Sequence, residues 1–412
     1  MYKPNRNGVG PSGSRGRGLS YSSSNRGRSN SRGSRKQSID PRRFIKAAQP
    51  ITAVDYVADN MFNDFDIHEL LKTNIAARGY KAPSHIQDKS IPVGLQGKDV
   101  IGIANTGTGK TAAFSIPLLN KMLSSPKSRA LIIAPTRELA MQIESEIRLF
   151  AKGSGLMGAL LIGGMPIQRQ FRELREKPNI VIGTPGRIKD HVKRGELALH
   201  TFDIIVLDEV DRMVDMGFID DIRYLLNELP KERQSLFFSA TLDANLRSLI
   251  ESFMRDPVMI SVKTGDTSDN VEQNVVYFQG TGQKIDMLHD ILIKPDVSKV
   301  LIFSETKRNV ERLSTNLVER GFKADALHGD KSQSQRLRAL KSFRDNNVNI
   351  LVATDVAARG IDVADITHVI NFDIPNTYDD YTHRVGRAGR GSNTGFALTF
   401  VEQSAVSNYG RY

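Results

Sequence analysis

The sequence predicts an α/β protein with two doubly wound parallel sheets. Short apolar runs of strand length alternate with stretches of helical spacing, first over residues 99–262 and again over residues 275–400. A polar, glycine-containing stretch, residues 263–270, separates the two series and has the composition of a linker. These observations predict two lobes of similar architecture joined by a short connection.

Most of the expected strands are short runs of β-branched and other apolar residues. The first lobe is expected to contain strands at residues 99–103, 131–133, 160–162, 180–182, 204–207, 236–238 and 258–260. The second is expected to contain strands at 275–277, 300–303, 324–327, 350–352, 368–370 and 397–400. The domain boundaries that we expect are a disordered tail at 1–38, an N-terminal extension at 39–61, the first lobe at 62–262, the linker at 263–272 and the second lobe at 273–412.

The composition fits a globular protein of a reducing compartment. Of 412 residues, 39% are hydrophobic and 25% are charged, which is ordinary for folded domains. The sequence has no cysteine, so disulfides and thiolate metal sites are excluded. It has neither an apolar run of the roughly 18 residues that span a membrane nor the apolar core of a secretory signal. We therefore expect a cytoplasmic protein without a membrane partner.

The basic character is concentrated in the tail. Of the net charge of +11, nine positive charges lie before Asp40, where the sequence has no acidic residue. Repeated Arg-Gly pairs in this tail are typical of a loose nucleic-acid-binding arm. A solubilising tail without a partner is the alternative, and a transit peptide is disfavoured by seven glycines and the lack of an amphipathic stripe.

A glycine-rich loop, Ala104 to Thr111 (A-N-T-G-T-G-K-T), follows the first expected strand and precedes a helix. This context identifies a phosphate-binding P-loop, whose backbone N–H groups surround a β-phosphate. Lys110 would contact the β- and γ-phosphates, and the Thr111 hydroxyl would bind Mg²⁺. Ala104 stands where the general pattern has its first glycine.

An apolar run, residues 204–207, ends in three carboxylates: Asp208, Glu209 and Asp211. Acids at the carboxyl end of a buried strand face the ligand edge of an open α/β sheet. One such acid can hold hydrated Mg²⁺ and the next can orient a water, as phosphoryl transfer requires.

Two further segments are candidates for the same site. Gln87 follows a helix that Gly79 ends, and its amide can donate and accept as the Hoogsteen edge of adenine requires. In the second lobe, residues 383–390 (H-R-V-G-R-A-G-R) contain three arginines separated by glycines. They form either a solvated basic loop or, opposite a P-loop, arginine fingers for the γ-phosphate.

The order of the motifs closely resembles that of the DEAD-box ATP-dependent RNA helicases, from about Phe62 to Arg390. The motifs are G-Y-K-A-P-S-H-I-Q, A-N-T-G-T-G-K-T, P-T-R-E-L-A, G-G, T-P-G-R, D-E-V-D, S-A-T, L-I-F-S-E-T, A-T-D-V-A-A-R-G-I-D and H-R-V-G-R-A-G-R. The compact core with a basic tail resembles the bacterial RhlE-like branch of that family. The signature reads D-E-V-D rather than D-E-A-D, so Val210 replaces an alanine while both metal-site acids remain.

The resemblance implies two RecA-like lobes that close over ATP, Mg²⁺ and single-stranded RNA. It implies ATP contacts at Phe62, Tyr80, Gln87, Ala104, Asn105, Thr106, Gly107, Thr108, Gly109, Lys110, Thr111, Gly360 and Asp362, and metal contacts at Thr111 and Asp208. Catalytic or coupling roles fall to Lys110, Asp208, Glu209 (the general base), Asp211, Ser239, Thr241, Arg387 and Arg390. RNA contacts fall to Pro135, Thr136, Arg137, Gly163, Gly164, Thr184, Pro185, Gly186, Arg187, Gln333, Arg336 and Thr354.

The expected function is RNA-dependent ATP hydrolysis that separates short RNA duplexes or remodels RNA–protein complexes, with low sequence specificity. Phosphate contacts carry no sequence information, which is why specificity should be low. The alternatives are an ATP-gated RNA clamp or assembly scaffold with incidental turnover, and a DNA translocase of the wider superfamily. Ribonucleoprotein partners are compatible with this function, and no heptad pattern implies an oligomer.

Overall fold

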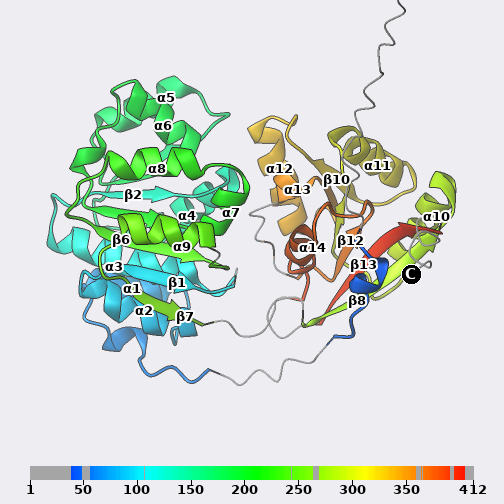
Figure 1. Ribbon diagram of the computed structural model, residues 1–412, viewed down its shortest axis with the longest axis horizontal. Helices are drawn as coiled ribbons and strands as arrows, with labels where there is room; N and C mark the ends of the chain where they lie inside the picture. Colours follow the sequence, from blue (N-terminus) through cyan, green and yellow to red (C-terminus); the bar gives the residue numbers. More distant parts are fainter. Residues whose placement is uncertain are drawn as a thin grey trace, which may run out of the picture. The chain divides into compact units, whose positions relative to one another are not determined.

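The computed structural model describes residues 39–48, 56–105, 107–242, 244–262, 269–358, 363, 365–389 and 394–403 (Figure 1). The tail that we expected to be disordered, residues 1–38, lies outside the described residues. So do four of the predicted site residues: Thr106, Gly360, Asp362 and Arg390.

The first lobe is built on a seven-stranded sheet whose described pairs are all parallel, in the order β3-β4-β2-β5-β6-β1-β7. Its strands are β1 (Val100–Ile103), β2 (Ala130–Ile133), β3 (Gly158–Leu161), β4 (Ile180–Gly183), β5 (Ile204–Leu207), β6 (Gln234–Ser239) and β7 (Val258–Ser261). Its helices are η2 (Phe62–Asp64), α1 (Glu69–Ala77), α2 (His85–Leu95), α3 (Lys110–Ser124), α4 (Arg137–Phe150), α5 (Ile167–Arg175), α6 (Pro185–Lys193), η3 (Leu199–Thr201), α7 (Val210–Asp215), α8 (Ile219–Asn227) and α9 (Ala244–Phe253).

The second lobe is built on a six-stranded parallel sheet in the order β10-β11-β9-β12-β13-β8. Its strands are β8 (Val271–Phe278), β9 (Val300–Phe303), β10 (Ala324–Leu327), β11 (Ile350–Ala353), β12 (His368–Asn371) and β13 (Gly395–Glu402). Its helices are α10 (Gly280–Leu292), α11 (Lys307–Glu319), α12 (Gln333–Arg344), α13 (Asp355–Ala358) and α14 (Tyr378–Val385). A short helix before the first lobe, η1 (Pro41–Phe44), lies beside β8 (Figure 1).

Most central strands of each sheet are buried on both faces, as continuous apolar strands require, whereas the edge strands β3, β7, β8 and β10 are partly exposed. In β5, Ile204 and Val206 belong to one hydrophobic cluster, and Ile205 and Leu207 belong to the cluster on the opposite face. This alternation follows from the two-residue repeat of a strand. Every expected strand is present, so the predicted α/β fold with two parallel sheets is confirmed.

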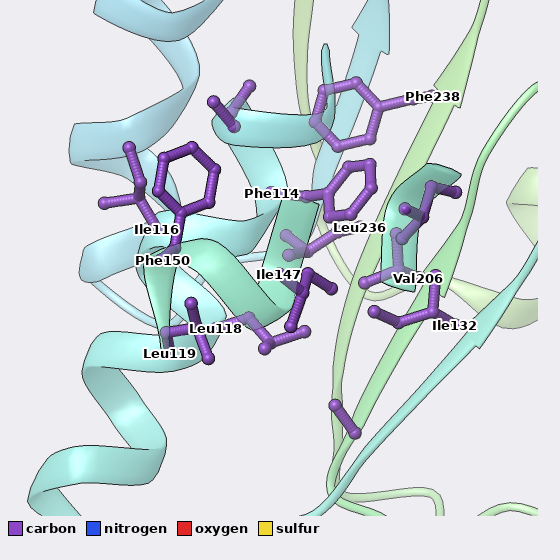
Figure 2. Close-up of a cluster of buried hydrophobic side chains, with 14 of the residues drawn as sticks. Phe114, Ile116, Leu118, Leu119, Ile132, Ile147, Phe150, Val206, Leu236 and Phe238 are labelled. Carbon is purple, nitrogen blue, oxygen red and sulfur yellow. The ribbon is translucent and has the colours of Figure 1, made fainter. Parts of the chain in front are cut away.

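The helix that follows the P-loop is held firmly by the first lobe's core. Phe114 of α3 is fully buried and packs at 5.5 Å, between ring centroids, against Phe238 of β6 (Figure 2). Phe150, at the end of α4, lies in the same cluster as Ile116 and Leu119 of α3 (Figure 2). A fully buried aromatic side chain contributes about 3 kcal/mol through its apolar area, so the N-terminus of α3 is fixed in place by its own packing.

Within the described residues, no helix has both the length and the hydropathy needed to cross a membrane.

Candidate functional site

The strand order divides the carboxyl edge of the first sheet into two halves. The P-loop follows β1, the acidic segment follows β5, and the S-A-T segment follows β6, which lies between β1 and β5. The other predicted segments, P-T-R-E, G-G and T-P-G-R, follow β2, β3 and β4, which are also neighbours. The fold therefore gathers the P-loop and the predicted catalytic residues of this lobe on one half of the edge and the predicted RNA residues on the other.

The P-loop connects β1 to α3 through a left-handed turn. Gly109 is the N-cap of α3 with φ 88°, and a Cβ atom there would lie 2.2 Å from Nε2 of Gln87, so only glycine fits. Lys110 is 6% exposed and its Nζ donates to the carbonyl of Ala104 at 2.9 Å. Thr108 Oγ1 donates to the carbonyl of Asn105 at 2.8 Å. The turn thus directs the N-terminus of a 15-residue helix toward the loop, where an anion is favoured.

Gln87 is a buried partner of this loop. Its Oε1 accepts from the backbone N–H of Ser84 at 2.9 Å, and its Nε2 donates to the carbonyl of Gly109 at 3.0 Å. Ser84 Oγ donates to the carbonyl of Thr108 at 2.7 Å. The segment from Ser84 to Gln87 is therefore hydrogen-bonded to two successive carbonyls of the P-loop, a connection that the sequence alone did not predict.

The two predicted aromatic contacts differ in exposure. Phe62 is 3% exposed, and its ring meets the ring of Tyr80 edge-on at 5.7 Å. Phe65 is the other edge-on neighbour of Phe62, at 6.0 Å. Tyr80 is half-buried and its hydroxyl donates to Glu146 at 3.3 Å. Phe62 is thus a core residue beneath Tyr80.

Asp208 and Glu209 follow the end of β5 and are buried inside the lobe. They are 3% and 6% exposed, and burial raises the pKa of Asp208 to about 7, although Lys110 opposes that rise. Glu209 adopts the left-handed conformation, with φ 52°, as the N-cap of α7. Such a backbone costs a non-glycine residue on the order of 1 kcal/mol and is retained mainly at functional sites. Arg212, also buried, pairs with Glu209 at 3.1 Å.

Asp211 joins the acidic segment to S-A-T. Its Oδ2 accepts from the backbone N–H groups of Ala240 and Thr241, both at 2.9 Å, and from Thr241 Oγ1 at 3.1 Å. Its own N–H donates to Ser239 Oγ at 3.3 Å. The carbonyl of Ser239 accepts from the N–H of Ala104, the first residue of the P-loop, at 3.0 Å. One continuous chain of bonds therefore connects the three segments.

The residues present fit a magnesium ion that is held mainly through a nucleotide. Within the part of the chain that the structure describes, no group of three or more His, Asp or Glu side chains forms a protein-only metal site. Mg²⁺ characteristically keeps several waters and uses one or two carboxylates together with substrate phosphates. Asp208 accepts a hydrogen bond from the N–H of Glu209, and its pKa is raised mainly by burial, with smaller contributions from the neighbouring Glu209 and Asp211.

On the other half of the edge, a buried amide connects the predicted RNA segments. Gln170 of α5 is 1% exposed; its Nε2 donates to the carbonyl of Ile162, next to Gly163, at 3.0 Å. Its Oε1 accepts from His191 Nε2 at 3.0 Å and from Arg187 at 3.5 Å. Gln170 was not among our predicted site residues, and a glutamine within an amphipathic helix gave no signal of this role.

Gly163 and Gly164 leave room for the guanidinium of Arg137. A Cβ atom on Gly164, where φ is 80°, would lie 2.6 Å from Nη1 of Arg137. Arg137 begins α4, with Thr136 as the N-cap. Pro185, Gly186 and Arg187 form the first turn of α6, which Thr184 precedes as N-cap. Pro135 immediately precedes Thr136, so every predicted RNA residue of this lobe lies at the ends of β2, β3 and β4.

In the second lobe, the described predicted residues lie on α12, just before α13 and just after α14. Arg387 is 5% exposed and its Nε donates to the carbonyl of His383 at 3.3 Å. Arg387 and His383 line one pocket with Glu209 and Asp211. Thr354 is buried just before α13. Gln333 and Arg336 of α12 hydrogen-bond Glu138 at 3.3 and 2.8 Å.

One ion pair of the second lobe was missed by the sequence interpretation. Arg384 is 3% exposed and forms a bidentate pair with Asp355, at 2.5 and 2.7 Å. It also donates to the carbonyl of Asp373 and to Asn371 Oδ1, at 2.8 and 3.1 Å. Both charged partners lie within predicted motifs, but their pairing required the adjacency of α13 and α14. This pair fixes the first arginine of H-R-V-G-R-A-G-R, leaving Arg387 at the pocket.

Comparisons with known proteins agree with this geometry. A family model described as DEAD/DEAH box helicase matches residues 84–249, and one described as helicase conserved C-terminal domain matches residues 283–392. The chain is 44% identical, over 343 residues, to the ATP-dependent RNA helicase CshA of Listeria monocytogenes; the match covers 83% of this chain and 66% of that protein. The chain thus spans about two thirds of that relative.

Two solved structures are similar to this chain over most of its length. A DEAD box protein from the hyperthermophile Methanococcus jannaschii is 37% identical, with a TM-score of 0.50, and the match covers 85% of this chain and 96% of that one. Dbp5 of S. cerevisiae, bound to RNA and ADP BeF3, is 28% identical with a TM-score of 0.72, over 84% of this chain and 93% of that one.

Proposed function

Because the chain belongs to the DEAD-box RNA helicase family, we propose that it is an RNA-dependent ATPase that separates short RNA duplexes. Closure of two lobes over ATP would grip one RNA strand by its phosphates, bend it and release the complementary strand. The observation that carries this proposal is the chain of hydrogen bonds from the P-loop through Ser239 and Asp211 to Thr241. It joins the P-loop to Asp211, which lies two residues after the proposed general base Glu209.

Each segment of the site has a distinct task in this reaction. Lys110 would neutralise charge on the β- and γ-phosphates, while Thr111 and Asp208 would hold Mg²⁺, which shields the phosphate charge when bound. Glu209 would orient the attacking water and accept its proton. Arg387 would meet the charge that develops on the γ-phosphate. Arg390, Gly360 and Asp362, for which the same resemblance implies roles at the ATP site, complete the proposed site in the second lobe.

RNA would lie along the other half of the edge. Arg137 beside the Gly163–Gly164 pair, and Arg187 at the start of α6, offer cations and helix N-termini to phosphate oxygens. Gln170 bonds the carbonyl before Gly163 as well as Arg187, so it would keep the two phosphate contacts in register. In the second lobe, Thr354, Gln333 and Arg336 would complete the path. These contacts would be made with the sugar-phosphate backbone of the RNA and not with its bases, so binding should have low sequence specificity.

The decisive experiment is steady-state ATP hydrolysis with no nucleic acid, with single-stranded RNA, and with DNA of the same sequence. We expect strong stimulation by RNA alone, with sustained multiple turnover. Equal stimulation by DNA would mean that the RNA surface is wrongly assigned. Slow hydrolysis with tight, ATP-dependent retention of RNA would favour an RNA clamp over a helicase.

Deleting residues 1–38 is expected to weaken RNA binding and to leave basal ATP hydrolysis unchanged. The tail carries nine positive charges and no acidic residue, so it would bind phosphates in any sequence context. For each phosphate that the shortened chain no longer neutralises, the plot of log affinity against log salt should flatten by about 0.7 for single-stranded RNA. The measurement is RNA affinity across a salt series.

The control for the tail is a chain of full length in which its arginines are replaced by serine. If this variant binds RNA as weakly as the deletion variant, the positive charges of the tail, and not its length, are responsible for its contribution to RNA binding. If both variants retain the affinity and the salt slope of the full chain, the tail has no RNA-binding role and serves solubility.

A further inference from the structure

The N-terminal segment Ile39–Lys46 is built into the second lobe, although it precedes the first lobe in the sequence. Asp40 caps η1 by accepting from the N–H of Arg42 at 3.0 Å, and Pro41 occupies the first helical turn, as is favoured there. Phe44, the last residue of η1, is fully buried in the hydrophobic cluster of the second lobe. A phenylalanine in a mere connection would be exposed, so this segment is part of a core.

Phe44 meets the second lobe at α14. Its ring centroid lies 4.6 Å from that of Tyr381, which is 1% exposed. The Tyr381 hydroxyl donates to Gln273 Oε1 at 2.9 Å and lies 3.5 Å from the carbonyl of Phe44. One turn earlier in α14, the ring of Tyr378 lies beneath the guanidinium of Arg43, at 4.0 Å from the ring centroid. Two aromatic side chains of α14 are thus covered by adjacent residues of η1.

The same segment holds the start of β8, the edge strand of the sheet. Lys46 and Gln273 exchange both backbone hydrogen bonds, at 3.0 and 2.8 Å, as an antiparallel pair. Lys46 Nζ also pairs with Asp269 at 2.6 Å. Two residues before Gln273, Val271 shares the cluster of Phe44 and would touch a Cβ atom placed on Gly389, at 3.0 Å. The segment therefore supports the strand against which the turn after Arg387 packs.

Helix α14 transmits this packing to the arginine motif. Tyr381 and Val385 lie on the buried face of the helix, and Arg384 is held by its ion pair with Asp355. The turn that follows is continuous with the helix: the N–H of Arg387 donates to the carbonyl of Arg384 at 3.1 Å. Moving α14 would therefore move the guanidinium of Arg387 relative to the phosphate that it is proposed to contact.

We propose that residues 39–46 are a positioning element of the second lobe, in which Phe44, through Tyr381, holds α14 and so aligns Arg387. This inference rests on the role of Arg387 given above. It assigns an effect on the chemical step to a segment that lies outside both matched helicase regions, which begin at residues 84 and 283. Phe44 is fully buried in the core of the second lobe and offers no polar group to a ligand, so its loss should alter catalysis more than substrate affinity.

The test measures kcat and KM for ATP with the full chain at saturating single-stranded RNA, for Phe44→Ala, Arg387→Ala and the double variant. Misplacing a catalytic group by about 1 Å can cost up to 10²-fold in rate, so Phe44→Ala is expected to lower kcat roughly 10-fold and to change KM less than about 2-fold. Arg387→Ala should lower kcat by at least about 10²-fold. Because Phe44 acts only through Arg387, its substitution should add less than about 2-fold when Arg387 is already absent.

Three further variants separate positioning from general stability. Phe44→Leu keeps an apolar side chain in the socket and should restore most of the rate. Tyr381→Phe keeps the ring and loses only the hydroxyl, so it should fold normally and lower kcat by about 3-fold. Phe400→Ala removes an equally buried aromatic side chain from the opposite face of the same sheet, and it should lower the melting temperature without a comparable loss of kcat.

Equal losses in the Phe44→Ala and Phe400→Ala chains would overturn the proposal, because the effect would then be general destabilisation. So would multiplicative losses in the double variant, or an unchanged kcat in Phe44→Ala. A wild-type rate in the Arg387→Ala chain would instead refute the arginine assignment in the proposed function, and the inference with it. That single variant distinguishes the two failures.

Discussion

Glu209→Gln is expected to lower the kcat of RNA-stimulated ATP hydrolysis by roughly 10³-fold and to leave the affinities for ATP and RNA nearly unchanged. A positioned general base contributes about 10²–10⁴-fold, and the amide can hold a water without accepting its proton. The substitution keeps the shape of a side chain that is only 6% exposed, together with an oxygen for Arg212. Single-turnover hydrolysis and equilibrium ATP binding measure the two halves of this expectation.

The neighbouring acid supplies the contrast. Asp208→Asn should weaken ATP binding only when Mg²⁺ is present, because Asp208 is the proposed metal contact, whereas Glu209→Gln should match the wild-type affinity both with and without the metal. The melting temperature of each variant checks that α7 is intact, since Glu209 is its N-cap. If Glu209→Gln hydrolyses ATP at the wild-type rate, another group is the base.

Lys110→Ala is expected to weaken ATP affinity by roughly 10²-fold. A hydrogen bond to a charged group contributes about 1.5–3 kcal/mol, and Lys110 is the cation at the N-terminus of α3 where the phosphates would lie. The side chain is buried near Asp208, and the loop sequence from Ala104 to Thr111 contains no second cation to replace it. Titration with a fluorescent ATP analogue gives the dissociation constant directly.

Lys121→Ala is the matched control, since it removes the same side chain from the last turn of the same helix. Lys121 pairs with Asp203 at 3.1 Å in a partly exposed position, and such pairs contribute at most about 1 kcal/mol to stability. Its ATP affinity should equal that of the wild type. Unchanged affinity in the Lys110→Ala chain, or an equal loss in both chains, would refute the P-loop assignment.

Local sequence patterns were enough to predict the strands, the two sheets and the segments along the carboxyl edge. Most of the strands are short runs of apolar residues that are buried on both faces, and a parallel sheet brings the residues after such strands to one edge. That is why Lys110 and Asp208 could be predicted together from the sequence, whereas the role of Ser239 was implied by the family resemblance. Their proximity follows from the strand order, in which β6 lies between β1 and β5, and local patterns did not predict that order.

What the sequence did not reveal are contacts between residues that share no local pattern. Gln170 is one polar residue on an amphipathic helix, and its bonds to Ile162 and Arg187 depend on how α5 packs beside α6. Phe44 stands in a short segment without a regular hydrophobic period, and its partner Tyr381 is 337 residues away. Hydrophobic periodicity carries information over one element, and a single buried phenylalanine before the first lobe has no period to detect.

The docking of Phe44 on Tyr381 has a consequence for the order in which the chain matures during synthesis. A ribosome adds roughly 5–20 residues per second, so Phe44 is incorporated about 17 to 70 s before Tyr381, the partner that will cover it, 337 residues later. Throughout that interval the first lobe can be completed, since its last strand ends at Ser261. The earliest apolar anchor of the nascent protein is therefore among the last to be buried, and the arginine motif acquires its final support only after nearly the whole chain has been translated.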